Sequence, residues 1–238
     1  FKPDIKNYLR HLRLGVPMAL QMSVVSIGMI FGQTALNSMN NVKMNAAYVA
    51  ATKIDGFACA AINSAGAAAA TYVGQNFGAK RYDRIKKGMG QLLIFDILLS
   101  LGLGGLVIVL YKPLIMLFIS SGDITDELFG YALTYLVFNA GFYTLLASLC
   151  ACRGALQGMG RGTLTLVSAA TEVVMRVTVS LLAQRFTSFT LVCMCNCASW
   201  LGANLILITG FLLVLKKYTP LFSPNIRRMP MPNQSALP

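Results

Sequence analysis

Two opposite charges lie four positions apart within a long apolar stretch of this sequence. Glu172 and Arg176 occur in residues 163–184, TLTLVSAATEVVMRVTVSLLAQ. Residues with this spacing lie on one face of a helix, so the two side chains can form an ion pair. One interpretation is a structural pair that allows both charges to be buried. The other is a proton- or cation-binding site whose carboxylate changes partner, because ionisable groups inside a membrane bundle commonly mark functional sites.

A second pair of charges, Lys53 and Asp55, lies in another apolar stretch. Residues two apart on a helix point to different faces, so these two cannot pair well with each other. We therefore expect partners on a neighbouring helix: Asp55 with Arg176, or Lys53 with Glu172. Lys53 could instead extend towards the outer membrane interface. Asp96 is expected near the start of its helix, where the helix N-terminus favours an anion.

The composition places these charges in a membrane protein. Of 238 residues, 56% are hydrophobic and only 12% are charged, and the mean hydropathy is +0.64. Soluble domains carry about 25% charged residues. Six apolar runs have lengths near the ~20 residues that a spanning helix needs. They cover residues 14–38, 46–73, 91–111, 127–151, 163–184 and 190–215. The sequence therefore predicts an all-α membrane protein, a bundle of six transmembrane helices.

The basic residues predict the topology of this bundle. With six spans, both termini and the second and fourth loops lie on one side, which holds 15 of the 20 Lys and Arg residues. Positively charged loops stay in the cytoplasm during insertion, so both termini are expected there, in a multi-pass protein of the plasma (inner) membrane. Residues 1–13 would form a cytoplasmic linker, 14–215 the transmembrane lobe, and 216–238 a cytoplasmic tail that is expected to be disordered.

Enzyme chemistry and nucleic-acid binding find little support in the sequence. The net charge of +12 is divided among loops by long uncharged runs, so it does not form the basic surface of a nucleic-acid-binding domain. The segment GQNFGAK (74–80) lacks the spacing of a nucleotide-binding P-loop. The cysteines alternate along helices and do not converge on a metal, and no Cys–His or Ser–His–Asp set occurs. We expect no catalytic residue, no metal site and no cofactor.

Several motifs occur in the order seen in one transporter family. The segments LGVPMALQ (14–21), AATKIDGF (50–57), ATYVGQNFGAKRYDRIKKG (70–88), CRGALQGMGR (152–161) and SAATEVVMRV (168–177) resemble the C-terminal half of MATE transporters, the multidrug and toxin extrusion family. Members have twelve spanning helices in two six-helix lobes around a central cavity. The resemblance implies that this chain is the C-terminal lobe, and that its partner is an N-terminal six-helix lobe, in the same longer chain or in a separate one.

The resemblance also implies a function. The expected activity is secondary active export of small organic, often cationic, compounds, driven by H+ or Na+. Some members place a coupling carboxylate in the first or fourth helix of this lobe, but residues 14–38 and 128–151 contain no Asp or Glu. Coupling is therefore expected at Glu172 or Asp55, with Arg176 and Lys53 as further candidates, or in the other lobe. The alternatives are a lipid-linked oligosaccharide flippase of the same superfamily and a non-transporting lobe that assembles with or regulates a partner.

Uncharged polar residues within the apolar runs are candidates for lining the transport cavity. Each could instead form hydrogen bonds that hold two helices together, which is the commoner role of Asn and Gln in membrane bundles. The candidates are Gln21, Gln33, Asn37, Asn63, Asn139, Tyr143, Asn196 and Asn204.

Overall fold

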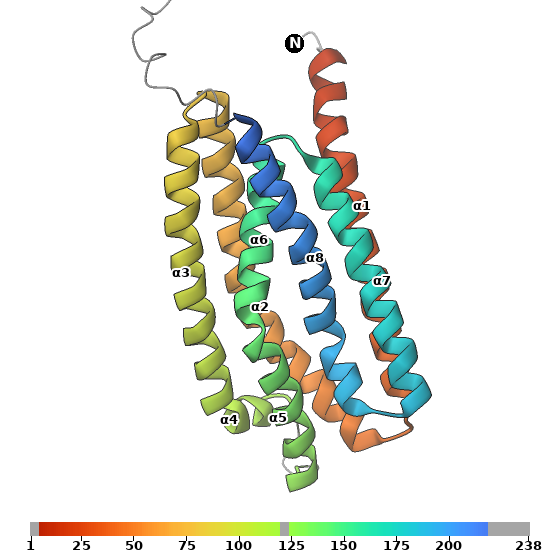
Figure 1. Ribbon diagram of the computed structural model, residues 1–238. Coiled ribbons are helices and arrows are strands. Elements are labelled where there is room, and N and C mark those ends of the chain that lie inside the picture. The colour runs from red at the N-terminus through yellow and green to blue at the C-terminus, as the bar shows by residue number, and fades with distance from the viewer. Residues whose placement is uncertain (1–4, 120–123, 219–238) are drawn as a thin grey trace, which may run out of the picture.

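The computed structural model describes residues 5–119 and 124–218, which form helices and no strand. Figure 1 shows the long helices running side by side along one common direction. The all-α fold predicted from the sequence is confirmed. The helices are α1 (Ile5–Asn37), α2 (Val42–Gly78), α3 (Tyr82–Val109), α4 (Tyr111–Met116), α5 (Asp126–Gly141), α6 (Tyr143–Gly158), α7 (Gly162–Phe186) and α8 (Phe189–Tyr218).

With the bent pair α5 and α6 taken as one span, the long helices alternate in direction, as the predicted topology requires (Figure 1). The beginning of α1, the end of α8, the α2–α3 turn and the α6–α7 connection lie at one end of the bundle (Figure 1). The helix α1 already begins at Ile5, so it extends into the predicted linker. Most of the predicted C-terminal tail, from residue 219 onward, lies outside the described residues.

Within residues 5–119 and 124–218, four helical segments are long and apolar enough to cross a membrane: Met18–Asn37 of α1, and the whole of α3, α7 and α8. The pair α5 and α6 passes the same test as one span that bends by 46°. The predicted span 46–73 lies in α2, which does not reach this apolarity because small and polar residues dilute its hydropathy. Its position explains the composition, since α2 packs against α3, α5 and α6 and needs less apolar surface.

Small residues allow α2 and α6 to pack with their backbones in contact. A Cβ atom added to Gly154 would overlap the carbonyl oxygen of Gly66, and one added to Gly158 would overlap that of Ala70. In the opposite direction, a Cβ on Gly66 would lie 2.9 Å from the carbonyl oxygen of Cys150. Membrane helices rely on such small-residue contacts because lipid offers them no hydrophobic driving force for association.

A polar side chain fixes the beginning of the bent pair. The sequence predicts that Thr125 or Asp123 caps this helix. Thr125 does so, because its Oγ1 accepts a hydrogen bond of 3.3 Å from the backbone N–H of Leu128. Asp123 lies outside the described residues. The pair breaks at Phe142, which lies between the end of α5 at Gly141 and the start of α6 at Tyr143.

Candidate functional site

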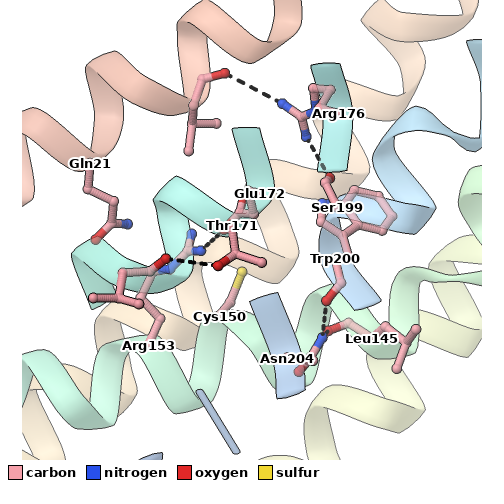
Figure 2. A network of polar contacts seen from close by, with 12 residues as sticks. Gln21, Leu145, Cys150, Arg153, Thr171, Glu172, Arg176, Ser199, Trp200 and Asn204 are labelled. Carbon is pink, nitrogen blue, oxygen red and sulfur yellow. Dashed lines mark hydrogen bonds and ion pairs between the residues drawn. The ribbon is translucent and has the colours of Figure 1, made fainter. Parts of the chain in front are cut away.

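Glu172 forms its ion pair with Arg153 instead of Arg176. Nη2 of Arg153, on α6, contacts Oε1 of Glu172, on α7 (Figure 2). Glu172 is only 3% exposed. The predicted pair within one helix is therefore wrong. Glu172 points from α7 towards α6, where Arg153 supplies the opposite charge. The apolar run ends at residue 151 and so places Arg153 in a loop, whereas α6 continues to Gly158.

Arg176 is buried with neutral partners. Its Nη2 donates a hydrogen bond of 3.1 Å to the hydroxyl of Ser199 on α8, as Figure 2 shows. Its Nη1 donates one of 3.5 Å to the backbone carbonyl of Val25 on α1, and its Nε has no hydrogen-bond partner among the described residues. Arg176 thus joins α1, α7 and α8, while the charge on its guanidinium is not balanced by a carboxylate in the ion pairs of the described chain.

Asp55 lies at the centre of a second polar group. The hydroxyl of Tyr143, on α6, donates a hydrogen bond of 2.7 Å to Oδ1 of Asp55, and the hydroxyl of Tyr135, on α5, donates one of 3.3 Å to Oδ2. All three residues are buried. On α8, Asn196 donates to the hydroxyl of Tyr135 at 3.2 Å and to Oδ1 of Asn139 at 3.0 Å. We call Asp55, Tyr135, Asn139, Tyr143 and Asn196 the Asp55 cluster.

The two predicted partnerships across helices are not formed. Asp55 is bonded by phenols, and Arg176 is bonded by Ser199 and Val25. Lys53 is exposed, and its Nζ lies 5.5 Å from the centre of the Phe118 ring, a cation–π contact. Lys53 therefore points away from Glu172, in agreement with the alternative that it extends from the bundle.

Asp96 lies in the middle of a helix and is 1% exposed. Its expected position near a helix N-terminus is wrong because α3 already begins at Tyr82. Neither carboxylate oxygen has a hydrogen-bond partner among the described residues. Burial of an unpaired charge is costly, so Asp96 is a third interior carboxylate whose charge needs neutralisation.

The other predicted cavity-lining residues mostly connect helices. Gln21, on α1, accepts a hydrogen bond of 3.3 Å from Gln157 on α6. Gln33 and Asn37 bond to Asn45 at the α1–α2 end, at 3.2 and 2.9 Å. The remaining contacts are Cys150 to Asn63 at 3.0 Å, Asn204 to the carbonyl of Leu145 at 2.8 Å, and Ser148 to Asn204 at 2.8 Å.

Comparisons with known proteins find one family. The MatE family model matches residues 17–182. A solved structure of a MATE in complex with MaL6 has a TM-score of 0.83 at 16% identity, covering 92% of this chain and 49% of that chain. An outward-facing multidrug resistance MATE transporter of the MOP superfamily has a TM-score of 0.75 at 19% identity, covering 93% and 49%. An inward-facing structure of such a transporter has a TM-score of 0.74 at 19% identity, covering 94% of this chain and 51% of that chain. No curated protein matches. The chain spans about half the length of these solved structures.

Proposed function

This chain belongs to the MatE family of transporters, and on that premise we propose that it forms the C-terminal lobe of a secondary active exporter. The exporter moves small organic, often cationic, compounds out of the cell in exchange for inward flow of H+ or Na+. An N-terminal lobe completes the transport cavity, which lies between the two lobes near the middle of the membrane. The protein resides in the plasma membrane with both termini in the cytoplasm, as its basic residues favour.

The Asp55 cluster is the observation that carries this proposal. A carboxylate inside a membrane bundle is costly unless a proton or a cation neutralises it. Asp55 is 7% exposed, and the hydrogen bonds that it receives come from neutral groups, the hydroxyls of Tyr135 and Tyr143 and the thiol of Cys59. These phenols orient the carboxylate without supplying a positive charge. H+ or Na+ is a suitable source of that charge, and its arrival or departure is the event that a coupled transporter requires.

The position of the cluster suggests how binding of the ion acts on the helices. Tyr135 precedes the 46° break between α5 and α6, and Tyr143 follows it. Asp55, on α2, therefore holds both halves of the bent span. Protonation of Asp55, or coordination of Na+ by it, weakens its acceptance of these two hydrogen bonds. The contact of α2 with the two halves of the span therefore depends on whether Asp55 is ionised, protonated or bound to Na+.

The cations within the helices favour an exporter over a flippase for pyrophosphate-linked lipids. A flippase needs several free cations in its cavity. In the described chain, Lys53 lies over the Phe118 ring and Arg153 is paired with Glu172. Among the described residues, Arg176 alone remains as a deep cation without an acidic partner, and one cation is too few to hold a pyrophosphate group.

The test is Asp55→Asn in the complete transporter, with this chain joined to its N-terminal lobe in proteoliposomes. The amide keeps the size of the carboxylate but cannot titrate. We expect dye efflux driven by a pH or Na+ gradient to fall to the background, with dye binding retained. The matched control is Asp126→Asn, which alters an exposed carboxylate in the first turn of α5 and should keep full efflux. Undiminished, gradient-dependent efflux in the Asp55→Asn variant would contradict the coupling role, and absence of efflux from the unmodified transporter would contradict export itself.

A further inference from the structure

A basic cleft lies between the end of α2 and the beginning of α3. It has a volume of about 780 Å³ and opens at the α2–α3 turn. Two cations of α3, Arg84 and Lys87, line it together with the amide side chains of α2, Gln75 and Asn76. These groups are hydrogen-bond donors suited to an anion. The full lining is Tyr72, Gln75, Asn76, Ala79, Asp83, Arg84, Lys87, Gly88 and Gln91.

Tyr72 gives the cleft a fixed wall. Its hydroxyl donates a hydrogen bond of 3.0 Å to the backbone carbonyl of Arg84. Its ring lies so close to Gly88 that a Cβ atom at that position would overlap it. The aromatic ring thus fills the space that a side chain at position 88 would take, and it ties α2 to α3 beside the two cations.

The one carboxylate of the cleft does not cancel its positive charge. Oδ1 of Asp83 lies 3.9 Å from Nε of Arg81, and both side chains are 53% exposed. Arg81 lies outside the cleft lining, so it offsets the charge of Asp83 from outside. Arg84 and Lys87 form none of the ion pairs in the described chain and remain available to a ligand.

The same face of α3 continues as an apolar surface. Arg84, Lys87 and Gln91 follow helical spacing, and Ile94 and Leu98 extend this row along the helix. Ile94 is 63% exposed and Leu98 is 65% exposed. Because α3 is among the segments apolar enough to span a membrane, this part of its surface suits contact with lipid chains. The cations at the beginning of α3 suit the headgroup of an anionic phospholipid. The apolar side chains further along the helix suit its acyl chains.

We propose that this cleft binds an anionic phospholipid such as phosphatidylglycerol. The phosphate lies between Arg84 and Lys87, the amides of Gln75 and Asn76 contact the polar headgroup, and the acyl chains lie along Ile94 and Leu98. Basic pockets between membrane helices recognise headgroups in this manner. A free phosphate would contact the cations but would make no contact with Ile94 and Leu98. This site is independent of the Asp55 cluster, so the proposal does not depend on transport by the protein.

The experiment is a titration of the purified chain in detergent with fluorescent phosphatidylglycerol and with phosphatidylcholine. The test variant is Arg84→Gln with Lys87→Gln. The matched control is Lys80→Gln with Lys86→Gln, which removes the same charge from exposed residues of the same segment outside the cleft lining. Each cation near a headgroup strengthens binding by roughly fivefold, so the test variant should bind phosphatidylglycerol about 25-fold more weakly. The control variant should bind like the unmodified chain.

Three results would overturn the proposal. Equal losses in the two variants would show attraction to a general basic surface. Equal affinity for phosphatidylcholine would show that the anionic charge is not recognised. Inorganic phosphate that displaces the lipid at equal concentration would show that the cleft binds a free anion and that the apolar row contributes nothing. Circular dichroism of both variants checks that the helices are intact.

Discussion

Tyr135 and Tyr143 donate hydrogen bonds to the two oxygens of a single carboxylate, that of Asp55, from opposite sides of a bend in the chain. A buried carboxylate therefore depends on two phenols that belong to different helices. Either hydroxyl can be removed without changing the aromatic ring, which makes the contribution of each hydrogen bond measurable.

Tyr143→Phe removes the shorter of these two hydrogen bonds. A buried acceptor that loses its donor costs about 1–3 kcal/mol, so the variant should unfold more easily and lose part of its ion-driven efflux. Thermal unfolding in detergent and efflux from proteoliposomes measure the two effects. The control is Tyr131→Phe, because the hydroxyl of Tyr131 donates its hydrogen bond to the exposed Glu127, at 3.4 Å. Equal stability of the two variants would contradict the importance of the Tyr143 contact.

The ion pair between Arg153 and Glu172 predicts a specific pattern of rescue. Removal of one partner leaves a buried charge uncompensated, at a cost of about 3–5 kcal/mol, so Glu172→Gln and Arg153→Met should each lower folded yield. The double variant should recover much of it, since neither charge remains. Arg176→Met combined with Glu172→Gln should show no such rescue because Arg176 bonds to Ser199 and Val25. Rescue by the Arg176 change would show instead that Glu172 pairs with Arg176, as expected from the sequence.

The backbone contact between α2 and α6 predicts that Gly154→Ala is harmful. The added methyl group would meet the carbonyl of Gly66, and overpacking of this kind costs about 1–3 kcal/mol. Gly102→Ala, on α3, is the control because its Cβ atom would have open space around it. Size-exclusion profiles and thermal unfolding of the two variants provide the measurement. If Gly154→Ala proves as stable as Gly102→Ala, the two helices can move apart to accommodate the added methyl group without loss of stability, and the prediction is wrong.

The distribution of basic residues predicts which end of the bundle faces the cytoplasm. Figure 1 shows the α1–α2 turn and the α2–α3 turn at opposite ends. In a background that lacks all six native cysteines, Val42→Cys should react with a membrane-impermeant maleimide added to intact cells. Asp83→Cys should react only after the cells are opened. The reverse pattern would invert the proposed orientation.

Much of the fold could be predicted from the sequence because apolar run length and helix capping are local properties. The positions of the long helices and the Thr125 cap are examples. The side-chain contacts of the site were harder to predict, because they depend on which face each helix turns towards its neighbours. Glu172 and Arg176 have the spacing of a pair, yet α7 directs one to α6 and the other to α1 and α8.

Two errors have a common physical cause. The apolar runs end or begin where charged residues occur, but the helices continue past these points. Arg153 lies beyond the end of one run and within α6, and Asp96 lies near the beginning of another but far inside α3. The Asp55–Tyr143 contact could not be derived from spacing at all, since it joins side chains from two helices distant in the sequence.

The glycine contact between α2 and α6 has a mechanical consequence for the bent span. Sliding α6 along α2 would drive the backbone at Gly154 and Gly158 into that of α2, whereas α5 is joined to α2 by the hydrogen bond from Tyr135 to Asp55. We therefore expect the two halves of the span to differ in freedom: α6 is held against the backbone of α2, and α5 can move relative to α6 at the break at Phe142. Asp55 contacts Tyr143, the first residue after this break, so a change of charge at the carboxylate would act where the two halves meet.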